Sequence, residues 1–242
     1  MRVAVAADQA LIREAVRTAL HARGETVLPL RWPDTDRPRA VRPEVGLLIS
    51  ELDRWDILES ARTVMTALPV PWVVLTECER GGRWGALVET GARAFLPIDT
   101  PLAAVDETLR AVEGGADLLG AGAEPLQRAW EQLREEHAEL TARLASLTPR
   151  ELTVLRLLYD GNPVNRIAET LAIAPATVRS QVKAIRHKLV VRSQLAAVAA
   201  YRHLVELDGA PPTVRLPRPR RPGGADRSTP ATRPTRPGQV RS

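Results

Sequence analysis

Short apolar runs alternate with amphipathic segments over residues 1–113. Five of these runs predict β-strands, at Arg2–Ala7, Thr26–Leu30, Val45–Ile49, Trp72–Thr76 and Ala94–Pro97. The other segments have helical periodicity and predict helices at Gln9–Ala22, Asp53–Leu68, Gly82–Thr90 and Pro101–Val112. Because strands that alternate with helices form a parallel sheet covered on both faces, the pattern predicts an α/β fold. We expect the doubly wound strand order 2-1-3-4-5.

A second, helical region begins at Leu147. Thr148 suits an N-cap, Pro149 suits the first helical position, and Glu151 completes a capping box. After this helix, which ends near Asp160, we expect three more, at Pro163–Leu171, Pro175–Leu189 and about Ser193 to Glu206. A tight turn at 172–174 joins the second and third of the four helices, and this arrangement predicts a helix-turn-helix.

The third of these helices has an apolar stripe and a basic outer face. The stripe consists of Val178, Val182, Ile185 and Leu189, and the outer face of Arg179, Ser180, Lys183, Arg186 and His187. A small helical bundle with a solvated charged face would also fit this pattern. However, residues 179–192 contain no acidic residue, and this favours a face that binds nucleic-acid phosphates.

Four motifs of this region occur together: LTPRE, IAETLAI, TVRSQVKAIRHKL and VRSQ. They resemble the DNA-binding domain of LuxR/FixJ-type (NarL-like) bacterial regulators over nearly all of residues 147–204. The resemblance implies groove contacts from Arg179, Ser180 and Lys183, and a dimer contact on the fourth helix. For the dimer contact we expect Gln194, Ala197, Val198 and Tyr201. Phosphate contacts are expected from Arg166, Arg186, Lys188 and Arg192.

The chain departs from this family's pattern at several positions. Ala174 replaces a serine that caps the recognition helix, a loss of about 1 kcal/mol, and Val190 stands where a glycine is usual. Pro163 and the pair Asn165–Arg166 also differ from the usual residues. Base preference therefore does not transfer from relatives to this chain.

The first region resembles the receiver domain of response regulators, a flavodoxin-like fold, through the segments DQALIRE, VVLT and GARAFLPID. Phosphotransfer to a receiver requires two acids that hold Mg²⁺, an acceptor aspartate, a hydroxyl residue and a lysine. The corresponding positions hold Ala7, Asp8, Ile49 (Ser50 if the register shifts by one), Thr76 and Ile98. We therefore expect a degenerate receiver that is not phosphorylated and that responds to a small ligand, a partner or dimerisation.

Both matching residues of this pocket also have structural explanations. Asp8 suits the N-cap of the first helix, and Thr76 suits the end of a strand. Asp53 would serve as acceptor only after a shift of four residues, and the lysine would still be missing. Trp32, Trp55, Trp72 and Trp84 would either line a ligand pocket or, as we prefer, pack in the core.

A heptad-like pattern connects the two regions. Its apolar side consists of Leu126, Trp130, Leu133, His137, Leu140, Leu144 and Leu147, at alternating spacings of four and three. This pattern predicts a linker helix that packs on the receiver-like domain or pairs between two protomers. A two-fold dimer would match two inverted half-sites on DNA.

Charge and composition divide the chain further. Residues 1–146 carry 17 arginines and 23 acidic residues, whereas residues 209–242 carry eight arginines, eight prolines and one aspartate. We expect this tail to be disordered and either a tether to DNA phosphates or passive. The proline-containing segment Arg31–Pro43 predicts an exposed loop.

A single cysteine, with no apolar run of 18 residues and no leader pattern, predicts a cytoplasmic protein without membrane contact.

The predicted organisation is a receiver-like domain over 1–120, a linker helix over 121–146, a helix-turn-helix domain over 147–208 and a basic tail over 209–242. No metal cluster, phosphate loop or catalytic motif is present, so we expect no cofactor and no enzymatic activity. The leading hypothesis is a dimeric regulator of transcription that binds double-stranded DNA and contacts RNA polymerase. The alternative is a protein-interaction module that acts on polymerase, a sigma factor or another regulator.

Overall fold

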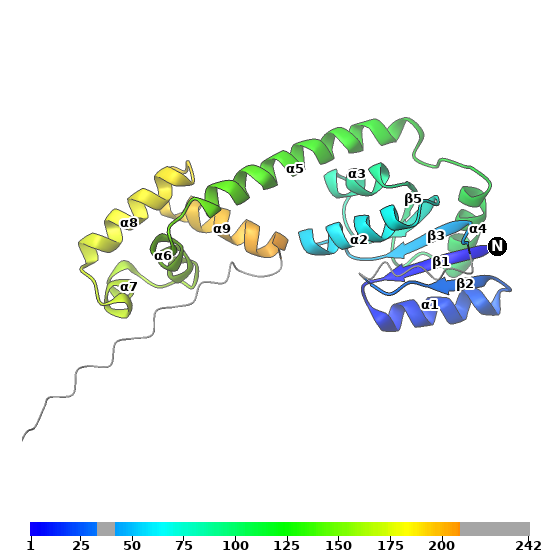
Figure 1. Cartoon of the computed structure of the whole chain (residues 1–242), viewed down its shortest axis with the longest axis horizontal. Helices are drawn as coiled ribbons and strands as arrows, with labels where there is room; N and C mark the ends of the chain where they lie inside the picture. The colour runs from blue at the N-terminus through cyan, green and yellow to red at the C-terminus, as the bar shows by residue number, and fades with distance from the viewer. Residues whose placement is uncertain (33–41, 209–242) are drawn as a thin grey trace, which may run out of the picture.

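The structure, a computed structural model, describes residues 1–32 and 42–208. The predicted tail and most of the predicted loop at 31–43 therefore lie outside the described residues. Figure 1 shows a sheet with its helices, a long helix and a further group of helices. No helix within the described residues is long and apolar enough to cross a membrane.

The first region contains the predicted parallel sheet. Its strands are β1 (Arg2–Ala7), β2 (Thr26–Pro29), β3 (Val45–Ile49), β4 (Trp72–Leu75) and β5 (Ala92–Leu96). They follow the order β2-β1-β3-β4-β5, and every neighbouring pair is parallel. The predicted fold class and strand order are thus confirmed. The carboxyl ends of all five strands lie at one edge, where ligands bind in open α/β sheets.

Two layers of helices cover the sheet, because the central strands β1, β3 and β4 are apolar on both sides. Helices α1 (Ala10–Ala22) and α4 (Leu102–Glu113) contribute Leu20, Val105 and Leu109 to one core. Helices α2 (Trp55–Ala67) and α3 (Gly82–Glu89) contribute to the core on the other face.

The long helix α5 (Ala123–Ala145) follows a short 3-10 turn, η1 (Gly120–Gly122), and joins the two regions (Figure 1). Its first half packs on the receiver-like region, where Leu126 and Trp130 are buried and Leu133 is half-buried. Its last turns contribute Leu140 and Leu144 to the core of the helical region. Of the two arrangements that we considered, the structure shows packing on the receiver-like domain. The buried first half of the apolar side is not accessible to a second protomer.

Close contact between α3 and α5 depends on two glycines. A Cβ atom at Gly85 would lie 1.9 Å from the carbonyl oxygen of Leu126, and one at Gly82 would lie 2.7 Å from that of Ala129. Any other residue at these positions would push the helices apart. Around this contact, His137 stacks on Trp55 with ring centroids 3.7 Å apart, and the indole Nε1 of Trp130 donates to Glu89.

Four helices form the C-terminal region: α6 (Pro149–Tyr159), α7 (Val164–Leu171), α8 (Pro175–Lys188) and α9 (Gln194–Asp208). Each of the four predicted helices is present, with bounds within two residues of the prediction. They enclose one core in which Val154, Leu155, Ile167, Val178, Ile185 and Tyr201 are buried.

Candidate nucleic-acid interface

The start of α6 fixes the position of α8 through the predicted capping box. Thr148 Oγ1 accepts from the Glu151 amide at 3.3 Å, and the Thr148 amide donates to Glu151 Oε2 at 2.7 Å. Lys188 Nζ at the end of α8 donates to the same carboxylate oxygen at 2.7 Å and to the carbonyl oxygen of Ser146 at 3.2 Å. Burial favours a raised pKa for Glu151, but the hydrogen bonds from Lys188 and Thr148 outweigh it and hold the pKa below its usual value.

Lys188 was expected to contact phosphate, and in the structure its ammonium group binds Glu151 and the Ser146 carbonyl between α6 and α8. The guanidinium of Arg186, expected in the same role, is half-buried and donates to the backbone carbonyl of Arg192. A phosphate contact from either side chain would compete with these contacts. Both cations support the position of α8 from within the domain.

The helix-turn-helix is formed by α7 and α8. The turn between them places Ala172 in the left-handed region at φ 52°, and the Ile173 amide donates to the Ala168 carbonyl at 3.0 Å. The buried residues Ile167, Ala168 and Val178 hold the two helices together. Because Ala174 has no side-chain acceptor, no side chain caps α8.

The outer face of α8 carries the predicted groove residues. Arg179, Ser180 and Lys183 are all exposed and lie on the side opposite Val178 and Ile185, which are buried in the core. Within the described part of the chain, neither Arg179 nor Lys183 has an ion-pair partner. Arg166 on α7 and Arg192 after α8 are also exposed, as a contact with phosphate requires.

Helix α9 presents a different surface from the one expected for dimer contacts. Ala197 and Tyr201 are each only 1 % exposed and belong to the domain's own core, so in this structure they are not available to a second protomer. Gln194 is exposed and Val198 is half-buried. The sequence analysis missed Leu195, which is 77 % exposed. A leucine that lies on the solvent side of a short helix was the signal that could have identified it.

The residues that were expected to correspond to the phosphorylation pocket of a receiver lie at the carboxyl edge of the sheet. Ile49 is the last residue of β3 and packs in the core, and Ser50, the alternative for the acceptor position, follows it at the carboxyl edge of the sheet. Its hydroxyl donates to Asp8 Oδ2 at 2.8 Å. Asp8 therefore does not cap α1, whose N-cap is Gln9.

The other pocket positions have structural roles. Thr76 Oγ1 accepts from the Cys78 amide at 3.0 Å and donates to the Glu51 carbonyl. Ala7 is buried, and Ile98 packs against the core with α1 and α4. Asp53 lines a pocket of about 570 Å³ at the same edge of the sheet, together with three glutamates, two arginines and His203 of α9. Within residues 1–32 and 42–208, no group of His, Cys, Asp or Glu is arranged to hold a metal ion.

The tryptophans of the receiver-like region pack against its core. Trp72 is fully buried against Gly46 of the neighbouring strand. Trp84 stacks on Phe95 at 4.1 Å between ring centroids, and Trp32 and Trp55 pack against the core under α2 and α3. Trp72 is thus a core residue, and the half-buried Trp32, Trp55 and Trp84 pack at the margin of the core.

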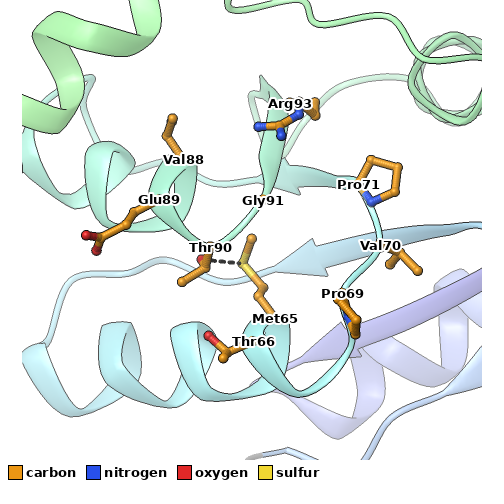
Figure 2. A pocket seen from close by; sticks show the side chains of 10 residues that line it. All are labelled: Met65, Thr66, Pro69, Val70, Pro71, Val88, Glu89, Thr90, Gly91 and Arg93. Atoms are coloured by element: carbon orange, nitrogen blue, oxygen red, sulfur yellow. Dashed lines mark hydrogen bonds between the residues drawn. The ribbon is translucent and has the colours of Figure 1, made fainter.

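A further pocket of about 520 Å³ lies between the ends of α2 and α3, away from all predicted site residues (Figure 2). Thr90 and Met65 meet there, with Thr90 Oγ1 donating to Met65 Sδ at 3.7 Å. The carboxylate of Glu89 is engaged by Arg62 and Trp130. This pocket presents a threonine- and proline-rich surface and adds nothing to the interface on α8.

Comparison with known proteins identifies the helical region. Residues 145–201 match the family described as bacterial regulatory proteins, luxR family. The chain is 27% identical over 203 residues to the uncharacterized transcriptional regulatory protein YxjL of Bacillus subtilis. The match covers 82% of this chain and 93% of YxjL. The chain is also 27% identical over 214 residues to the transcriptional regulatory protein LiaR of Bacillus subtilis. That match covers 85% of this chain and 99% of LiaR.

Among solved structures, the response regulator ChrA is similar to the chain at 24% identity and a TM-score of 0.39, and the match covers 85% of this chain and 98% of that one. The matched family model spans the helices that form the interface, and the full-length relatives are named transcriptional regulators. Residues 145–201 therefore carry a domain of the luxR family, and the chain as a whole is similar to transcriptional regulators that include the probable transcriptional regulatory protein NarL of Mycobacterium tuberculosis, at 26% identity over 208 residues.

Proposed function

We propose that this chain regulates transcription by binding a specific sequence of double-stranded DNA with α8 in the major groove. The observation that carries the proposal is the outer face of α8. Arg179, Ser180 and Lys183 are exposed there, and the segment 179–192 contains no acidic residue. Long cations in this position reach guanine O6 and N7 or the flanking phosphates.

The charge of the rest of the chain supports the same assignment. The helical region 147–208 carries nine lysines and arginines against five acidic residues, whereas the region 1–146 is acidic. Phosphate binding by the first region would be opposed by its own field. DNA contact therefore belongs to the helical region.

The proposed active form is a homodimer that binds two inverted half-sites. Gln194 and Leu195, at the exposed start of α9, are the residues that we propose for the contact, with Val198 at its edge. Light scattering of the full chain at micromolar concentration, free and on DNA, tests this. A monomer under both conditions would exclude the dimer.

Control by phosphorylation is absent in our proposal. The acceptor position is Ser50, whose hydroxyl is bonded to Asp8, and Ile98 replaces the lysine that would stabilise a phosphoryl group. A small ligand, a protein partner or dimerisation would control the protein instead. Incubation with acetyl phosphate and Mg²⁺, followed by intact mass measurement, should show no added phosphoryl group. A stable aspartyl adduct on Asp8 or Asp53 would overturn this part.

Genome-wide binding of the wild type and of Lys183→Glu tests the DNA-binding function. Lys183→Glu reverses a charge on the groove face, and we expect sharp binding sites to disappear. Arg128→Glu is the matched control, because Arg128 is an exposed arginine on α5 and pairs only weakly with Glu124 at 3.6 Å. It should keep the sites. If the wild type binds no discrete sites, the chain acts through protein contacts, on polymerase or another regulator.

A further inference from the structure

The first turn of α8 presents small apolar groups to solvent. Residues 172–176 are Ala-Ile-Ala-Pro-Ala. Ile173 packs against the domain core, whereas Ala172, Ala174, Pro175 and Ala176 are exposed. The first turn contains no acidic residue, and no side chain caps the helix. The leading end of α8 therefore offers methyl and methylene surface, and the cations begin one turn later, at Arg179.

Ala176 lies on the same side of α8 as the groove residues. It precedes Arg179, Ser180 and Lys183 by three, four and seven positions, the spacings that place residues on one helical face. All four side chains are exposed. Recognition helices contact base edges with their N-terminal residues. A helix that brings Arg179 and Lys183 to DNA therefore brings Ala176 to the groove as well.

Building on the proposed function, we infer that Ala176 contacts the 5-methyl group of a thymine and makes each half-site specific for thymine at that base pair. An alanine side chain has no hydrogen-bond donor or acceptor. The thymine methyl is the base-edge group in the major groove that such a side chain discriminates by apolar contact. Arg179, one turn along, suits a neighbouring guanine.

The test begins with selection of bound sequences from a random duplex library by the full chain. Each thymine of the selected sequence is then replaced by deoxyuridine, which lacks only the 5-methyl group, and the affinity is measured by fluorescence anisotropy. For the wild type we expect binding to weaken about fourfold at one thymine in each half-site, the effect of losing one buried methyl group.

Variants of the protein identify the side chain that makes the contact. Ala176→Gly should bind the thymine and deoxyuridine probes equally, because it lacks the side-chain methyl group that contacts the 5-methyl group of thymine. Comparing two probes on one variant cancels any change in helix stability. Ala199→Gly removes a methyl from an exposed position of α9 and should keep the fourfold difference.

Three results would overturn the inference. The fourfold difference in affinity between the thymine and deoxyuridine probes could persist in Ala176→Gly. It could instead vanish in Thr177→Ser, which removes the neighbouring exposed methyl group. Alternatively, no thymine could respond to loss of its methyl. If the library yields no enriched sequence at all, the proposed function itself fails together with the inference, and this outcome is distinct from the other three.

Discussion

Single residues decide how much of the basic surface is available to DNA. Lys188 and Lys183 are five positions apart on α8, yet one is tied to Glu151 and the other is exposed. The charge pattern of α8 could not separate them, because the partner of Lys188 is 37 residues away in the sequence. The sequence left the choice between Ile49 and Ser50 open for a similar reason, because it depends on where β3 ends.

Val190 stores strain in the turn after α8. Its φ of 57° lies in the left-handed region, which a β-branched residue rarely adopts, and its side chain is 70 % exposed and makes little compensating contact. Val190→Gly should therefore raise the free energy of unfolding, by about 1 kcal/mol. Urea denaturation measures this. Val191→Gly is the control, because Val191 packs against the core and its replacement should destabilise. A lower free energy of unfolding for Val190→Gly than for the wild type would show that Val190 is not strained.

The pair Lys188–Glu151 should contribute stability that depends on pH. Lys188→Met removes the cation beside a carboxylate that is 8 % exposed, and we expect a loss of about 1.5 kcal/mol at pH 7. Because the folded pKa of Glu151 lies below its usual value of 4.5, this stability is present above that pH. It disappears as pH falls through the lower, folded value.

Denaturation of the wild type and Lys188→Met from pH 7 to pH 3 measures this dependence. The two proteins should converge at the acid end. Lys183→Met removes a lysine from the same helix where no ion pair is formed within the described residues, and it should change stability little at any pH. A difference between wild type and Lys188→Met that is constant with pH would show that the ion pair does not stabilise the domain.

At the scale of elements, the sequence predicted the helices and strands well but not what covers them. The apolar side of α5 was visible as a spacing of four and three. Periodicity shows that one side of a helix is buried and leaves the covering surface open. In the structure that side is shared between two cores, with Trp130 in the first and Leu144 in the second. The sequence signal for packing of α5 on the receiver-like core was the pair Gly82 and Gly85, because two glycines on α3 allow a second helix to approach closely.

Gly85→Ala tests the α3–α5 contact. The new Cβ atom would overlap the Leu126 carbonyl, so we expect a loss of about 2 kcal/mol of stability and partial separation of α5 from α3. Exposure of Trp130 should shift the tryptophan fluorescence to longer wavelength. Gly81→Ala is the matched control, because the nearest atom to its new Cβ lies 3.9 Å away. Equal fluorescence spectra and stabilities for the two variants would disprove the close contact.

At the scale of the whole molecule, an acidic α/β domain is joined to a basic DNA-binding domain and a tail with eight arginines and one aspartate. The sequence predicted the two folded regions from hydrophobic periodicity and motifs. The difference in charge between them could be read from the sequence as well, because charge sums do not depend on the fold. The helical periodicity of the sequence predicted that Arg179, Ser180 and Lys183 lie on the outer face of α8, where they are exposed. It could not predict the contacts of Lys188 and Arg186, because these are tertiary.

Removal of residues 209–242 tests the proposed tether. Eight arginines would each release counterions on contact with phosphates, so truncation should weaken DNA binding and flatten its dependence on salt. Sequence preference should remain, because the groove residues are intact. Titrations at several salt concentrations measure the slope, and an unchanged slope would favour a passive tail.

We propose a regulator that binds DNA whether or not it has been exposed to a phosphoryl donor. The most direct test is the affinity of the full chain for its selected DNA sequence, measured before and after treatment with acetyl phosphate and Mg²⁺. We predict binding that is specific in both states and equal between them, since in our proposal Ser50 and Ile98 replace the acceptor aspartate and the lysine of a receiver domain. Specific binding that appears only after treatment, together with an added phosphoryl mass, would contradict the account.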